Sequence, residues 1–135
     1  MKTRDKSELI KLALISDFHM DWDYTPGMNS DCDMPICCRS TSGLPSTPEK
    51  AAGKWGDYNC DIPPRTLENL LDHIANEVKP DAIFWGGDSV PHNLNSQSVE
   101  SNVEVMKNTT KLTVDHLKGY NIFPAMGNHD TYPQD

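Results

Sequence analysis

Three short apolar runs alternate along this chain with two longer segments that have helical periodicity. The runs cover residues 11–16, 81–85 and 121–126. Each has the length and continuity of a strand in a parallel sheet that is covered on both faces. A polar signature follows each run directly, so the pattern predicts three buried strands that carry polar side chains at their carboxyl ends.

The two segments between these runs are predicted to be helices. Pro63 and Pro64 open the first, because proline is favoured in the first turn, and Pro80 ends it. The second is expected over residues 98–118, with Gly119 at its C-cap. The apolar stripe of the first helix is Leu67, Leu70, Leu71, Ile74, Ala75 and Val78. The weaker stripe of the second is Val99, Val103, Met106, Val114 and Leu117. The order βαβαβ predicts an α/β fold with a parallel sheet.

Residues 17–62 show no persistent period, and they contain all four cysteines: Cys32, Cys37, Cys38 and Cys60. A loop of about 45 residues is unusual in a compact domain unless it is functional or cross-linked. Disulfides are favoured over free thiols and over structural zinc, for which no Cys-x-x-Cys pair or histidine knuckle is present. A bond between the neighbours Cys37 and Cys38 would be strained, so two pairings remain open. Disulfides would imply an oxidising compartment.

The 135 residues carry a net charge of −8 and suffice for at most one domain. This charge argues against a nucleic-acid polymer as partner, although bound cations can bring a phosphorylated substrate to an acidic protein. No apolar run approaches the roughly 20 residues of a transmembrane helix. No signal peptide is apparent, because residues 9–15 are interrupted by Lys11 and lack a small-residue cleavage site.

The polar signatures are Asp17-Phe18-His19, Gly86-Gly87-Asp88 and Gly127-Asn128-His129-Asp130. Ligands of parallel sheets bind beyond the carboxyl ends of the strands, so the three signatures are expected to meet. A carboxylate and an imidazole one residue apart, Asp17 and His19, suit zinc, iron or manganese. Asp88 can bridge two metals, and Asn128 offers a neutral oxygen to the second.

Two metals about 3.5–4 Å apart clamp the attacking and leaving oxygens of a phosphoryl displacement and supply a hydroxide nucleophile. His129 is then expected to act as a general acid, and Asp130 to hold its ring or raise its basicity. Each signature alone is often a plain turn. The three in this order, each after a predicted strand, favour a two-metal phosphoesterase site.

The series D-x-H, G-D and G-N-H-[DE] resembles the calcineurin-like metallophosphoesterases. Within them, residues 17–24, 37–39, 53–58, 60–63 and 85–88, with His92, resemble the acid sphingomyelinase family. The resemblance implies the βαβαβ half of a metallophosphoesterase sandwich with a disulfide-stapled loop between the first strand and the first helix. It also implies a phosphodiesterase, lysosomal or secreted, that hydrolyses sphingomyelin to ceramide and phosphocholine with two zinc ions.

Carried over by position, Asp17 and His19 bind the first metal, Asp88 bridges and Asn128 binds the second. His129 protonates the departing ceramide alkoxide, with Asp130 beside it, and His92 contacts the phosphate. The implied disulfides are Cys32–Cys37 and Cys38–Cys60.

Asp130 departs from this family, which commonly has glutamate there. Residues 128–135 lean toward the acid-sphingomyelinase-like phosphodiesterases, which act on nucleotides and other phosphodiesters. The remaining histidine ligands of the family lie on later strands. Residues 1–135 are therefore expected to be the N-terminal portion of a catalytic domain, without a saposin-like domain. We expect this portion to be inactive alone, and any membrane contact to be made by other regions. The alternatives are a metallophosphoesterase acting on nucleotides or phosphomonoesters, and an inactive fragment.

Overall fold

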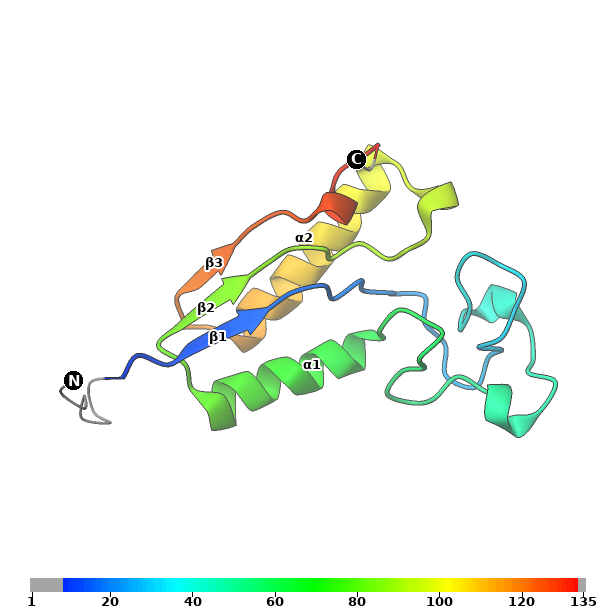
Figure 1. Cartoon of the computed structure of the whole chain (residues 1–135), viewed down its shortest axis with the longest axis horizontal. Helices are drawn as coiled ribbons and strands as arrows, with labels where there is room; N and C mark the ends of the chain where they lie inside the picture. The colour runs from blue at the N-terminus through cyan, green and yellow to red at the C-terminus, as the bar shows by residue number, and fades with distance from the viewer. Residues whose placement is uncertain (1–8, 134–135) are drawn as a thin grey trace, which may run out of the picture.

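A computed structural model describes residues 9–133 as a three-stranded parallel sheet with two helices (Figure 1). Strands β1 (Leu12–Ile15), β2 (Ala82–Trp85) and β3 (Ile122–Pro124) lie in the order β1-β2-β3. The predicted α/β fold and the βαβαβ order are confirmed. Strands β1 and β3 end before their apolar runs do, because the residues that follow turn into the polar signatures, whereas β2 ends with its run at Trp85.

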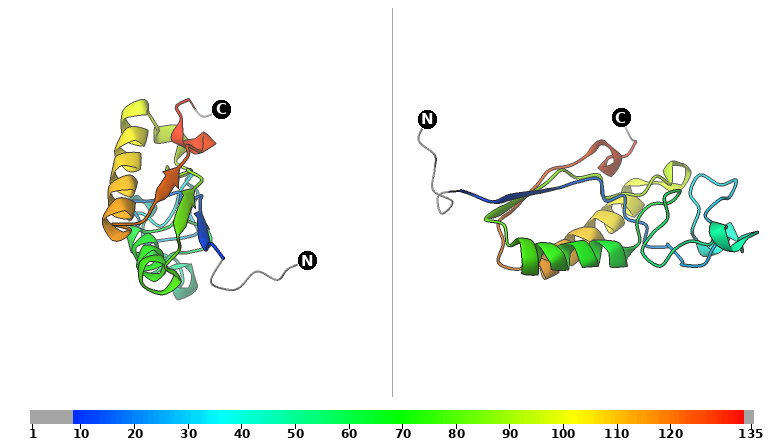
Figure 2. Two further views of the ribbon diagram at one scale, coloured as in Figure 1. Left: turned by 90° about the vertical axis from the view of Figure 1, so that its left-hand side faces the viewer. Right: turned by 60° about the horizontal axis from the view of Figure 1, so that its bottom comes forward.

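Both helices cover the same face of the sheet (Figure 2). Helix α1 (Pro64–His73) begins where the two prolines predict it and continues as a π-helical turn, Ile74–Val78. Helix α2 (Val99–His116) is capped by Ser98, whose Oγ accepts a hydrogen bond from the Ser101 backbone N–H. The core lies between this face and the helices. Its buried members are Ile15, Phe18, Met20, Leu67, Leu71, Ile74, Ile83, Trp85 and Leu117.

The opposite face of the sheet is bare over the described residues. The register aligns Leu14 with Phe84 and Phe84 with Phe123, and all three side chains are exposed. The expectation that the strands are covered on both faces is therefore wrong for this part of the protein. Local sequence shows that a strand is apolar on both sides, but what packs on each side depends on the rest of the fold.

The buried face of α2 also differs from the predicted stripe. Asn102, Thr109 and Thr113 are buried, and of the predicted residues only Leu117 joins them. The Thr113 Oγ1 donates to the Thr109 carbonyl at 2.8 Å, and the Asn102 Nδ2 donates to the Thr131 carbonyl at 3.2 Å. Hydrogen bonds thus allow the Asn102 and Thr113 side chains to face the core, whereas the Thr109 hydroxyl is buried without a partner in the described chain. Apolar periodicity detects none of the three.

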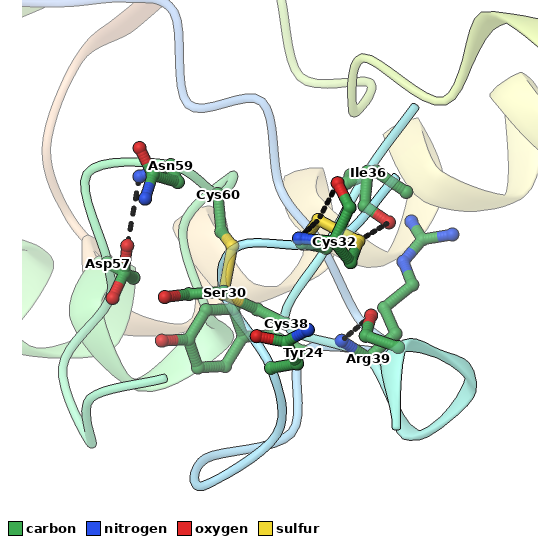
Figure 3. Close-up of a disulfide and its surroundings, with 12 residues drawn as sticks. Tyr24, Ser30, Cys32, Ile36, Cys38, Arg39, Asp57, Asn59 and Cys60 are labelled. Atoms are coloured by element: carbon green, nitrogen blue, oxygen red, sulfur yellow. Dashed lines mark hydrogen bonds between the residues drawn. A yellow bond between two sulfur atoms is a disulfide. The ribbon is translucent and has the colours of Figure 1, made fainter. Parts of the chain in front are cut away.

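The long loop between β1 and α1 is irregular apart from isolated β-bridges and two 3₁₀ turns, Ser40–Ser42 and Pro48–Lys50. Its cysteines form the disulfides Cys32–Cys37 and Cys38–Cys60, the pairing that the resemblance implies (Figure 3). All four thiols are bonded, so the zinc and free-thiol alternatives are wrong. We call residues 17–62 the stapled loop.

A buried ion pair also fixes the stapled loop. The fully buried Asp21 accepts hydrogen bonds from the Arg39 guanidinium at 2.9 and 3.0 Å and from the Asp23 backbone N–H at 3.0 Å. Burial raises the pKa of Asp21, and the Arg39 cation opposes this rise. In the part of the chain that the structure describes, no helix has the length and apolarity to span a bilayer.

Candidate metal centre

The segments that follow β1 and β2 stay side by side after both strands end. The backbone N–H groups of Asp17, His19 and Met20 donate to the carbonyls of Gly87, Asp88 and Ser89, at 3.1, 2.9 and 2.8 Å. This pairing aligns the first signature with the second. It brings residues about 70 positions apart to one edge of the sheet, as the placement at strand ends predicts.

Three residues of this edge have left-handed backbone conformations. The φ angles of Asp17, His19 and Asp88 are 57°, 40° and 56°. Such conformations are uncommon outside glycine, and asparagine, aspartate and histidine tolerate them best. Strained backbone of this kind clusters at functional sites, where it directs side chains that a regular strand would not bring together.

Gly87 allows the second and third signatures to approach each other closely. Its φ is +86°, and a Cβ at this position would overlap the Gly127 backbone nitrogen and lie 2.7 Å from the Met126 carbonyl carbon. No larger residue fits without separating the two loops.

We predict that Gly87→Ala lowers the free energy of unfolding by about 1–3 kcal/mol more than Gly119→Ala, because only the former adds overpacking to backbone strain. Gly119 is a matched control, since its φ is +95° and an added Cβ there meets nothing within 4 Å. Urea unfolding of both variants measures the difference. Equal losses would show that the close approach at Gly87 carries no cost.

The donor atoms of Asp17, His19 and Asp88 lie within 4.8 Å of one another. The His19 Nδ1–H donates to the Val90 carbonyl at 2.9 Å, which leaves Nε2 as the free ring nitrogen, 4.0 Å from the Asp17 Oδ1. Asp88 uses Oδ1 to accept from the His129 backbone N–H at 2.8 Å and makes no described hydrogen bond through its other oxygen. Two carboxylates and an imidazole with a fixed tautomer fit a divalent cation of the zinc, iron or manganese type.

Two further imidazoles, those of His92 and His129, pack against the ring of His19. The ring of His92 lies face to face with His19 at 3.9 Å between centroids, and the His129 ring lies edge-on to both at 4.8 Å. Partial burial, followed by the charges of His19 and His92, lowers the pKa of His129. The protonated form of His129 is therefore populated only at more acidic pH than for a free histidine.

Asp130 has a different set of partners from the one predicted. Its buried carboxylate accepts hydrogen bonds from the backbone N–H groups of Gly127, Asp88 and Ser89, at 2.9, 2.9 and 2.8 Å. The ring Nδ1 of His129 is buried without a hydrogen-bond partner in the described chain. The expectation that Asp130 holds the His129 ring is therefore wrong. The Asp130 carboxylate accepts all three of these hydrogen bonds from backbone amides, and it thereby links the second signature to the third.

The Asn128 side chain is exposed and makes no hydrogen bond within residues 9–133, so its assignment as a ligand remains a prediction from its place in the turn between Gly127 and His129. Two polar contacts near the site involve residues that the sequence did not single out. Asp61 accepts a hydrogen bond from the His92 ring, and Asn102 holds the carbonyl of Thr131. Both contacts join residues about 30 positions apart, and no local signal reveals them.

Comparison with known proteins identifies relatives of this chain. Sphingomyelin phosphodiesterase B of Dictyostelium discoideum is 40% identical over 134 residues, which cover 94% of this chain and 20% of that protein. Sphingomyelin phosphodiesterase of Homo sapiens is 36% identical over 124 residues, covering 91% of this chain and 20% of the human protein. Acid sphingomyelinase-like phosphodiesterase 3b of Mus musculus is 34% identical over 122 residues and is covered to 25%.

The chain thus spans about a fifth to a quarter of the length of these relatives. The calcineurin-like phosphoesterase family matches residues 10–135, which include all three signatures and both helices. This chain belongs to the calcineurin-like phosphoesterase family.

Proposed function

We propose that this chain contributes to a metal-dependent phosphodiesterase that hydrolyses sphingomyelin to ceramide and phosphocholine. The observation that carries the proposal is the convergence of Asp17, His19 and Asp88 beside two further imidazoles at the carboxyl edge of the sheet. The similarity to proteins named sphingomyelin phosphodiesterases, over about 90% of this chain, supports the substrate class.

In this proposal Asp17 and His19 hold one divalent cation, zinc by resemblance, Asp88 is shared between two, and Asn128 belongs to the second. When bound, such cations supply Lewis acidity at a phosphoryl oxygen and lower the pKa of water. His129 donates a proton to the departing alkoxide. His92 contacts the phosphoryl group, and Asp130 keeps the two signature loops in place.

The domain assignment is a proposal of the same kind. Residues 1–135 are the N-terminal portion of the catalytic domain, and further parts of the gene product complete the metal ligands. The bare apolar face formed by Leu14, Phe84 and Phe123 supports this, because an apolar sheet face is stable when another layer covers it. We expect the 135-residue chain alone to be inactive, and we place the protein in the lysosome or outside the cell, where the disulfides persist.

A second candidate is a phosphoesterase that acts on nucleotides or phosphomonoesters. The similarity to an acid sphingomyelinase-like phosphodiesterase favours it, as does the aspartate at position 130.

A substrate panel with the complete gene product that carries this chain decides between the two. We expect hydrolysis of sphingomyelin that is lost on dialysis against a chelator and restored by zinc. Hydrolysis of nucleotides with none of sphingomyelin would favour the second candidate. Activity that survives complete metal removal would contradict both.

A further inference from the structure

Asp61 accepts two hydrogen bonds from His92. Its Oδ2 accepts a hydrogen bond from the backbone N–H of His92 at 2.7 Å, and its Oδ1 accepts one from the ring Nδ1–H at 2.7 Å. The Asp61 side chain is only 10% exposed, whereas that of His92 is 49% exposed. A histidine whose Nδ1 is occupied in this way leaves Nε2 as its free nitrogen.

The direction of this free nitrogen is limited by the neighbouring rings. His92 lies face to face with His19, and its ring contacts His129 edge-on. His19 is held in the same manner, by the Val90 carbonyl on its Nδ1. Both imidazoles therefore have one nitrogen tied to the protein and one nitrogen left for the site.

Asp61 is itself held on both sides along the chain. The preceding Cys60 is bonded to the buried Cys38 (Figure 3). The following Ile62 pairs with Met20 in a β-bridge and accepts a hydrogen bond from the Asp21 backbone N–H at 3.0 Å. The carboxylate thus has a fixed position relative to both the stapled loop and the segment that follows β1.

We infer that Asp61 is a positioning residue that holds the His92 ring with Nε2 directed at the phosphoryl group, and that the stapled loop thereby forms part of the active site. The inference rests on the proposed function and adds to it a residue outside the three signatures. Carboxylates that orient imidazoles in metal sites contribute about 10- to 100-fold in affinity or activity. A link that only ties two loops together would instead contribute to stability and leave the turnover of folded protein unchanged.

The test uses the complete gene product with Asp61→Asn, Asp61→Glu, His92→Ala and the double variant Asp61→Asn/His92→Ala. We expect Asp61→Asn to lower kcat/KM on the phosphodiester substrate about 10- to 100-fold at unchanged metal content. Asp61→Glu, which keeps the carboxylate, restores part of this loss. In the His92→Ala background Asp61→Asn costs no more than about twofold, because Asp61 acts through His92.

Asp31→Asn is the matched control, because it removes a carboxylate of the same loop whose described ion pair is with the exposed Lys50 and not with a histidine of the site. Thermal unfolding of both asparagine variants is expected to agree. The ring ¹⁵N shifts of His92, measured without metal, give an independent readout: the Nδ1–H form of the wild-type protein is expected to be lost in Asp61→Asn.

Each outcome is decisive. Unchanged kcat/KM in Asp61→Asn, additive losses in the double variant, or unfolding of Asp61→Asn while Asp31→Asn folds would overturn the inference alone. Wild-type protein without phosphodiesterase activity would overturn the proposed function, and the inference with it.

Discussion

Asp88→Asn in the complete gene product is expected to lower phosphodiester hydrolysis by three orders of magnitude or more. Removing a single preorganised electrostatic group from an active site already costs about 10²–10³ in kcat, and Asp88 is proposed to be shared between two cations. Asparagine keeps the oxygen that accepts the His129 backbone N–H, and it tolerates the left-handed φ of 56°. The loss would therefore reflect the missing charge. Kinetics and metal content measure it.

The matched control is Asp115→Asn on the solvent side of α2, where the carboxylate pairs with Lys111. This variant is expected to retain wild-type kinetics and metal content, because the pair is exposed and lies within one helix. Full metal content and turnover in Asp88→Asn would contradict the assignment of Asp88 as the shared ligand.

Arg39→Met is expected to lower the free energy of unfolding at neutral pH by about 3–5 kcal/mol, because it leaves the buried Asp21 carboxylate without its counter-ion. Asp21 is fully buried, and the Arg39 side chain is 13% exposed. Urea unfolding of the gene product, followed by a probe in this domain, measures the loss. In the same loop Lys50→Met breaks the exposed pair with Asp31 and is expected to cost at most about 1 kcal/mol.

The deficit of Arg39→Met should shrink at acidic pH. Burial raises the pKa of Asp21 in the folded protein above its ordinary value, so protonation favours the folded state, and this contribution is lost as the pH rises through the folded pKa. Removing Arg39 removes the main interaction that opposes the rise. A variant that loses the same free energy at neutral pH and near pH ~4, where free carboxyls titrate, would contradict this account.

Much of the fold could be predicted because its signals are local. Pro64 marks the start of α1, and Gly119 follows α2 in a left-handed conformation that favours glycine. The predicted apolar stripe of α2 was wrong because the buried face of this helix is partly polar. Asn102 and Thr113 donate hydrogen bonds to backbone carbonyls, and no periodic pattern reveals these bonds.

The candidate site divides in the same way. Asp17, His19 and Asp88 were identified because each follows an apolar run, and the structure brings their donor atoms together. Asp130 was found with the wrong partners, and Asp61 was missed. Asp130 bonds to Ser89, 41 positions away, and Asp61 bonds to His92, 31 positions away.

The amino-acid sequence was sufficient to predict the elements, their order and the polar signatures at the strand ends, because the signals for strands and helix ends lie in residues that are neighbours along the chain. The resemblance added the disulfide pairing. Only the tertiary structure decided which sheet face is covered, which side of α2 is buried, and how the stapled loop reaches His92 through Asp61. These features depend on which distant groups meet to satisfy a buried charge, amide or apolar surface, and that information is absent from any local pattern.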